Sequence, residues 1–189
     1  MSGIPPYGYQ SVYPSAPSMY PSQGFVPPPT PGARMFRPVV EWRDASSGAV
    51  PVANPVIGGH DVNSEPLYIG STEIDGDLVP GKVVQSHRCC YVAYAGREHS
   101  SRIYHVLVNP SNCELVWQHS SHGKVPTGAI QGGRTADGEP LYIGRHYHDG
   151  SLTVGKIHPS HGRLYISFGG EEVPYSEYEV LCCKHVPLM

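Results

Sequence analysis

The chain has 189 residues, enough for one domain of medium size or two small ones with a real hydrophobic core. Only 15% of the residues are charged, while glycines number 22 and prolines 20, and this composition excludes a coiled coil or a protein of long helices. The net charge of −3 provides no basic surface for nucleic acid, and the sequence has no run of about 18 apolar residues that could span a membrane.

The first segment, residues 1–38, is rich in proline and tyrosine. It holds 10 of the 20 prolines and only two charged side chains, Arg34 and Arg37. Such a segment buries too little apolar surface to offset the entropy lost on ordering, so we predict a disordered tail with polyproline II stretches. The tail is a solubilising linker or a docking segment for protein partners. The linker interpretation is favoured because the tail has no Pro-Pro-x-Tyr motif.

The remainder of the chain consists of two copies of one unit. When residues 58–107 are laid over residues 132–181, at an offset of 74 without a gap, 21 of the 50 positions are identical. The matches fall in blocks such as Glu-Pro-Leu-Tyr-Ile-Gly, Asp-Gly, Gly-Lys and Ser-His, and Trp42 matches Trp117 with a shift of one residue. Blocks of identity at a constant offset indicate a tandem repeat, with units at 39–112 and 113–189.

Within each copy the apolar residues alternate along short segments. At residues 90–94 and 164–168 the even positions are apolar in both copies, which predicts a strand with the even side chains in a core and the odd ones facing out. Turn residues recur every few positions between such segments. We therefore predict an all-β fold made of two pseudo-symmetric antiparallel units, sandwich-like or barrel-like, in which the two tryptophans occupy equivalent places.

The recurring pattern resembles the DM-nine repeat. The resemblance covers residues 40–183 and rests on the Gly-Gly, Leu-Tyr-Ile-Gly, Gly-Lys, Ser-His, Gly-x-Glu and Tyr-x-Val-Leu blocks. Members of that family have an all-β tandem fold, and a molluscan member is a mannose-binding lectin. The resemblance implies a sugar site built from the acid of a Gly-x-Asp turn and the lysine of a Pro-Gly-Lys turn. In the first copy these residues are Asp61 and Lys82.

The second copy departs from this pattern. Lys156 is kept, but Thr135 replaces the acid, and Asp137 could substitute only if the loop shifts. Glu98 and Glu172 also recur, and two roles stay open for them, a place in the sugar site or a buried carboxylate bonded to a turn. A carboxylate accepts hydrogen bonds from sugar hydroxyls and an ammonium donates to them, so an acid and a lysine suit a sugar ligand.

Other chemistry has weaker support in the sequence. His87 and His161 recur after a serine and are predicted to be structural. Asp75-Gly76-Asp77 resembles a calcium loop only loosely, so we expect a calcium-independent site with no metal and no cofactor. The five cysteines include two adjacent pairs, which suits reduced thiols, with Cys90 and Cys182 as small core residues. No nucleophile elbow, P-loop, dinucleotide fingerprint or HExxH motif is present, so we expect no enzyme.

Two functions therefore compete. The first is a lectin-like protein that binds mannose-containing glycans, in innate immune recognition, with a possible homodimer. The alternative is a cytosolic stress-responsive scaffold that recruits protein partners through its tail. The start of the sequence lacks a basic segment and an apolar run, so we expect a cytoplasmic location, with unconventional secretion or vesicle association left open.

Overall fold

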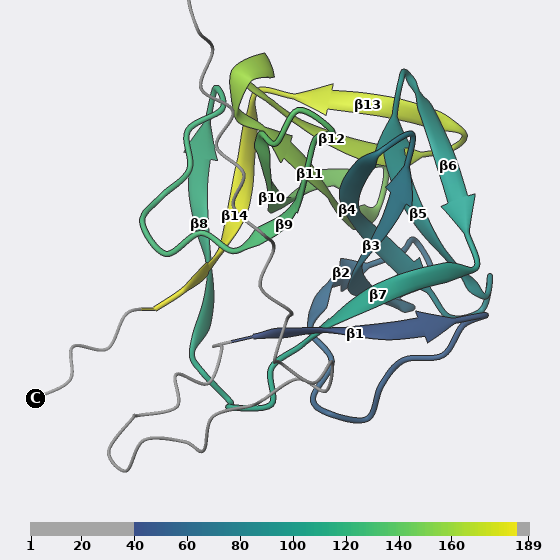
Figure 1. The fold of residues 1–189 in the computed structure, drawn as a ribbon. Helices are drawn as coiled ribbons and strands as arrows, with labels where there is room; N and C mark the ends of the chain where they lie inside the picture. The colour runs from purple at the N-terminus through teal and green to yellow at the C-terminus, as the bar shows by residue number, and fades with distance from the viewer. Residues whose placement is uncertain (1–39, 185–189) are drawn as a thin grey trace, which may run out of the picture. The chain divides into compact units, whose positions relative to one another are not determined.

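The computed structural model describes residues 40–184, which fold almost entirely into β-strands (Figure 1). The strands of the first repeat are β1 (Glu41–Ser46), β2 (Ile57–His60), β3 (Pro66–Ile74), β4 (Asp77–Val84), β5 (Cys89–Tyr94), β6 (Arg97–Ser101) and β7 (Ile103–Val108). Those of the second repeat are β8 (Leu115–Ser121), β9 (Gln131–Arg134), β10 (Pro140–His148), β11 (Ser151–His158), β12 (Arg163–Phe168), β13 (Glu171–Tyr175) and β14 (Glu177–Cys183). A short 3-10 turn, η1 (Pro159–His161), joins β11 to β12.

The all-β prediction is confirmed, and the two repeats contribute matching strands in the same order. The predicted boundary between residues 112 and 113 falls in the connection between β7 and β8. No helix within residues 40–184 is long and apolar enough to cross a bilayer. The proposed tail at 1–38 lies outside the described residues.

The repeated Asp-Gly pairs make the central hairpins. Asp75 and Gly76 have φ values of 50° and 89°, and Asp149 and Gly150 have 44° and 85°. Two successive residues with positive φ form the turn whose twist matches that of antiparallel strands, and Asp-Gly is well suited to it. These turns fix the registers of β3 with β4 and of β10 with β11, the longest hairpins of the fold.

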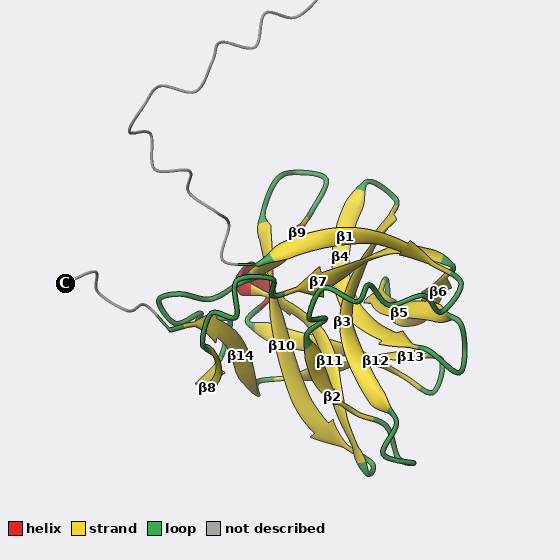
Figure 2. Ribbon diagram, turned by 90° about the horizontal axis from the view of Figure 1, so that it is seen from below, coloured by secondary structure: helices red, strands yellow, loops and turns green. Residues whose placement is uncertain are grey.

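The two repeats close one sheet together rather than folding side by side (Figure 2). The strand order β3-β2-β11-β12-β13-β6-β5-β4 returns to β3 through the β3–β4 pairing, which gives a closed ring of eight strands. Two of its junctions cross between the repeats, β2 with β11 and β6 with β13. A third pairing between the repeats joins β4 of the ring to β9, which lies outside the ring. The antiparallel pairs β1–β7 and β8–β14 lie outside the ring. The first joins the ring because β7 pairs with β3, and the second because β14 pairs with β10, which in turn pairs with β11.

One core cluster lies between the repeats and is built from equivalent residues of both. It contains Ile69 with Ile143 and Leu107 with Leu181, and Trp42 and Trp117 pack against it. Each tryptophan pairs in register with the corresponding leucine, Trp42 with Leu107 and Trp117 with Leu181. The prediction that the two tryptophans occupy equivalent places is confirmed.

The predicted alternation holds on one face only. Cys90, Val92 and their counterparts at 164 and 166 are fully buried, as predicted, and Cys182 is buried as well. However, Ala93 and Ser167, which were expected to face out, are each only 1% exposed. The reason is that β5 and β12 contact each other across the repeat interface, so the second face of each strand is covered by the other repeat. Tyr91 and Tyr165 on this face are half-buried.

A glycine at the β2–β11 crossing provides a test of the shared sheet. A Cβ atom on Gly59 would lie 1.8 Å from the carbonyl oxygen of Leu152, so Gly59→Ala forces the two strands apart. We expect this substitution to lower the free energy of unfolding by about 3 kcal/mol, measured by urea denaturation. Gly138→Ala is the control, because nothing lies within 4 Å of its Cβ position and only its φ of +91° opposes alanine, at a cost of about 1 kcal/mol. Equal losses in the two variants would contradict this account of the crossing.

Candidate functional site

Two cavities occupy equivalent positions in the two halves of the ring. The first pocket has a volume of about 350 Å³ and is lined by Asp61, Val62, Asn63, Leu67, Lys82, Val84, His87, Tyr91, Glu98, Ser151, Phe168 and Gly169. The second pocket has about 290 Å³ and is lined by Asp77, Tyr94, Ala95, Lys156, His158, His161, Tyr165 and Glu172. All eight residues of the second pocket match residues of the first at the offset of 74, taken in either direction. Each pocket therefore takes side chains from both repeats.

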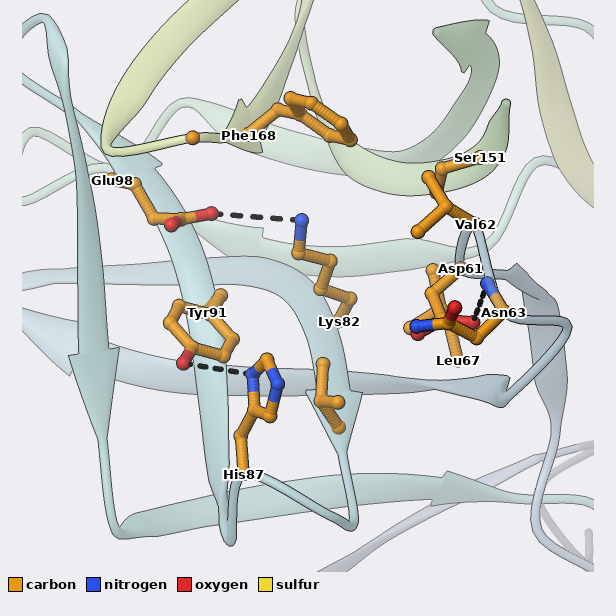
Figure 3. A pocket seen from close by; sticks show the side chains of 12 residues that line it. Asp61, Val62, Asn63, Leu67, Lys82, His87, Tyr91, Glu98, Ser151 and Phe168 are labelled. Atoms are coloured by element: carbon orange, nitrogen blue, oxygen red, sulfur yellow. Dashed lines mark hydrogen bonds and ion pairs between the residues drawn. The ribbon is translucent and has the colours of Figure 1, made fainter. Parts of the chain in front are cut away.

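Lys82 lies at the centre of the first pocket (Figure 3). The residue is only 8% exposed, and its ammonium donates a hydrogen bond to the carbonyl oxygen of Ser167 in the other repeat. Its Nζ is 3.5 Å from a carboxylate oxygen of Glu98 and lies 5.4 Å from the ring centre of Phe168 and 5.8 Å from that of Tyr91. Burial lowers the pKa of Lys82, and the neighbouring Glu98 opposes that shift. The ammonium is thus held by one carboxylate and one carbonyl, beside two aromatic rings.

The glycine before each lysine explains why the lysine sits here. A Cβ on Gly81 would meet the carbonyl oxygen of Tyr91 at 2.1 Å, and a Cβ on Gly155 would meet that of Tyr165 at 2.0 Å. Glycine therefore lets β4 approach β5, and β11 approach β12, so closely that each lysine pairs in register with the tyrosine of its own pocket. The repeated Gly-Lys block thus has a structural reason as well as a chemical one.

The two glutamates tie the repeats together while they hold the lysines. Glu98 accepts a hydrogen bond from the backbone N–H of Gly170 at 3.3 Å, and Glu172 accepts one from that of Gly96 at 2.6 Å. Glu172 also pairs with Lys156 at 3.0 Å. The carboxylates therefore bond to a turn, which is one of the two roles that the sequence left open, and they also lie against the pocket lysines. A place for them in a sugar site stays a prediction.

Asp61 and Lys82 line the same cavity, on different sides of it (Figure 3). One carboxylate oxygen of Asp61 accepts hydrogen bonds from the backbone N–H groups of Asn63 and Glu65, at 2.8 and 2.7 Å. These bonds fix the turn between β2 and β3 and hold the acid in place at the rim. The acid and the amine predicted from the resemblance are thus brought together by the fold.

In the second pocket the acid comes from the other repeat. Thr135 takes over the turn role of Asp61, because its hydroxyl accepts from the N–H of Glu139 at 3.0 Å. Asp137, the predicted substitute, is exposed on this turn and does not line the cavity; the acid that faces Lys156 in addition to Glu172 is Asp77. Asp77 accepts from the N–H of Ala136 at 2.7 Å. Sequence reasoning missed Asp77 because it stands at the start of β4, in the opposite repeat from Lys156.

The repeated Ser-His block serves both structure and pocket. Glu139 accepts hydrogen bonds from the N–H and the hydroxyl of Ser160, at 2.8 and 2.7 Å, and Glu65 forms the same pair of bonds with Ser86. The histidines that follow lie at the pocket rims, where a ring nitrogen of His87 is 3.1 Å from the hydroxyl of Tyr91. Burial raises the pKa of Tyr91 to about 12, so this phenol remains protonated and able to donate.

Within residues 40–184, no three His, Cys, Asp or Glu side chains are arranged to hold a metal ion.

Comparison with known proteins identifies the family. The family model of the DM9 repeat matches residues 36–101 and 87–175. The chain belongs to the DM9 repeat family.

Among curated DM9 relatives, the chain is similar to natterins of Thalassophryne nattereri. Natterin-4 is 29% identical over 144 residues, which cover 75% of this chain and 33% of natterin-4. Natterin-3 is 34% identical over 93 residues, which cover 49% of this chain and 23% of natterin-3. The chain thus spans about a third or less of the length of these relatives.

Among solved structures, the fold of this DM9 chain is similar to that of the nematode sperm cell motility protein MFP2B. The TM-score is 0.60 with 17% sequence identity, over 78% of this chain and 46% of the MFP2B chain. At this identity the likeness concerns the fold alone.

The two hydrogen bonds that Glu139 accepts from Ser160, called here the Glu139 clamp, lead to a prediction about stability and pH. Burial of the Glu139 carboxyl works against its charge, but the two hydrogen bonds from Ser160, together with the fields of His158 and His161, lower its pKa. Because the folded pKa is lowered, the clamp contributes fully above the unfolded value of about 4.3 and is lost as the pH falls through the folded value. We expect Glu139→Gln to cost about 1–2 kcal/mol at pH 7 in urea denaturation, and the difference from wild type to shrink below pH 4.

The matched control is Glu73→Gln, since Glu73 is an exposed carboxylate on β3. It should change the free energy of unfolding by less than about 0.5 kcal/mol. A loss in Glu139→Gln that is no larger than in this control would show that the clamp contributes nothing.

Proposed function

We propose that this protein binds carbohydrate in the two pockets, without calcium. The observation that carries the proposal is the buried lysine of each pocket, flanked by a carboxylate and two aromatic rings and faced by a second acid across the cavity. This set of groups occurs twice, at equivalent places in the two repeats. The volumes lie near the lower end of the range of about 300–1,000 Å³ usual for small-molecule sites, which suits a ligand of the size of one sugar ring.

The groups present match the chemistry of a sugar. Sugar hydroxyls both donate and accept hydrogen bonds; the ammonium of Lys82 donates to them, and the carboxylates of Glu98 and Asp61 accept from them. One ammonium hydrogen of Lys82 is used by the Ser167 carbonyl, which fixes the direction of the others. The rings of Tyr91 and Phe168 offer apolar surface for the C–H face of a pyranose. Because the protein's own cation and anions make these contacts, no bound metal is needed.

Mannose is the finer form of the proposal, and it rests on the resemblance of the Asp61 and Lys82 turns to those of a mannose-binding relative. A bidentate anchor on neighbouring hydroxyls distinguishes axial from equatorial epimers, which would separate mannose from galactose. Two charged anchors per site correspond to a dissociation constant between about 1 mM and tens of micromolar for a monosaccharide. Two pockets on one chain would raise the apparent affinity for a glycan-coated surface without new contacts, which suits recognition of such surfaces.

The alternative function, a scaffold that recruits protein partners through residues 1–38, stays a prediction because those residues lie outside the described part of the chain. The homodimer and the cytoplasmic location also stay predictions, because no observation on the described residues bears on them. The pockets favour carbohydrate binding.

Calorimetric titration tests the proposal. Methyl α-D-mannopyranoside should bind at neutral pH in the presence of EDTA, more tightly than the galactoside, at two sites per chain. Lys82→Met removes the donor of the first pocket and should weaken that site at least tenfold, while Lys124→Met, at an exposed turn lysine, should leave both sites unchanged. Thermal unfolding of each variant separates loss of binding from loss of the fold. Absence of any heat of binding at tens of millimolar sugar would overturn the proposal.

A further inference from the structure

The second pocket differs from the first by a pair of stacked histidines. His158 lies where the first pocket has Val84, and both residues are buried, at 9% and 4% exposure. The imidazole of His158 stacks on that of His161 with ring centres 3.6 Å apart and planes within 6°. In the first pocket the counterpart of His161 is His87, and the residue at 84 offers it no second imidazole.

The surroundings of His158 hold groups of both signs. On its own strand β11 lies Lys156, on the turn before β10 lies Glu139 with an oxygen 3.4 Å from the His158 ring, and on β4 lies Asp77. Burial is the largest influence and lowers the pKa of His158, the positive field of a protonated His161 lowers it further, and Glu139 opposes the shift. Tyr165 on β12, Glu172 on β13, and Tyr94 and Ala95 at the end of β5 complete the lining. Arg163 on β12 pairs in register with His158.

His161 is the member of the stack that has room to move. It is exposed, and it ends the 3-10 turn η1, whereas His158 is buried at the end of β11, where it pairs in register with Arg163 of β12. Its ring meets the ring of Tyr165 edge-on at 5.9 Å, with a ring nitrogen 3.3 Å from the tyrosine hydroxyl. Tyr165 in turn lies beneath the ammonium of Lys156, 5.5 Å from it. The stack therefore supports one wall of the cavity.

We propose that the histidine stack makes ligand binding in the second pocket sensitive to pH, so that this pocket holds sugar at neutral pH and releases it in mild acid while the first pocket retains it. This inference rests on the proposed function and describes the regulation of one of its two sites.

The physical reason is the repulsion between two imidazolium ions. A stack of neutral rings, or of one neutral and one charged ring, is compatible with a separation of 3.6 Å, but two positive charges at that distance repel strongly in a partly buried site. The ammonium of Lys156 adds to the repulsion. His161 then leaves the stack and its contact with Tyr165, and the wall opens. Because protons favour the open wall, a ligand that needs the closed wall binds more weakly as the pH falls.

Nuclear magnetic resonance of the full chain reads the two pockets separately. The backbone amides of Gly169 and Ala95 line the first and the second pocket at equivalent positions. On titration with methyl α-D-mannopyranoside at pH 7.5, both amide signals should shift. At pH 5.5 the Gly169 signal should shift with nearly the same dissociation constant, and the Ala95 signal with one at least tenfold larger.

Two reciprocal substitutions exchange the property. His158→Val gives the second pocket the valine of the first and should remove the pH dependence reported by Ala95. Val84→His should introduce a pH dependence at Gly169 that wild type lacks. Thermal unfolding at both pH values shows whether each variant is folded. Loss of the pH dependence at Ala95 in His158→Val, or its gain at Gly169 in Val84→His, would assign the effect to the histidine stack rather than to a general effect of acid on the protein.

The outcomes separate the two ideas. The inference is wrong if the dissociation constant reported by Ala95 is the same at pH 5.5 as at pH 7.5, or if Ala95 does not respond to sugar at pH 7.5. If Gly169 responds in either case, the proposed function of the first pocket stands. If neither amide responds at either pH, the proposed function fails and the inference fails with it.

Discussion

Two buried ion pairs lie where the two repeats meet, and each lines one of the two cavities. Each pairs a lysine with a glutamate of its own repeat, Lys82 with Glu98 and Lys156 with Glu172. A buried ammonium is costly unless it is paired and hydrogen-bonded, and here each glutamate is in turn fixed by a backbone N–H of the other repeat. Each pair lies within one repeat, but the bonds that fix it come from the other. A single repeat would leave Lys82 without the carbonyl of Ser167 and Glu98 without the N–H of Gly170.

The same arrangement explains why the pockets are alike but not equal. The ring closes by strand pairings between repeats, so each cavity takes its floor from one repeat and part of its wall from the other. Substitutions accumulated in one repeat then change both pockets in different places. Asp61 lines the first pocket from the β2–β3 turn of the same repeat as Lys82, whereas Asp77 lines the second from the opposite repeat to Lys156. His158 in place of Val84 gives the second pocket a titratable wall that the first does not have.

The sequence predicts the β-strand content and the duplication, and it singles out the recurring lysines and glutamates, because each depends on patterns that recur at one constant offset. It also predicts the equivalent places of Trp42 and Trp117, which follow from matched strands. It does not predict that each lysine pairs with a glutamate. The sequence does not predict that Ala93 and Ser167 are buried or that Asp77 reaches the second pocket. Both follow from the way the repeats clasp each other, and a contact between strands of different repeats leaves no periodic signal in either one. The role of Glu98 was ambiguous for the same reason, since its partner Gly170 lies 72 residues further along the chain.

The central claim is that the cavities beside Lys82 and Lys156 are sites for a sugar and that both repeats build each of them. A crystal structure of the full chain soaked with methyl α-D-mannopyranoside at neutral pH tests it most directly. The account predicts one sugar ring in each cavity, with hydroxyl groups within hydrogen-bond distance of the lysine ammonium and with protein contacts from both repeats. Sugar bound on another surface, with both cavities holding only water, would contradict it.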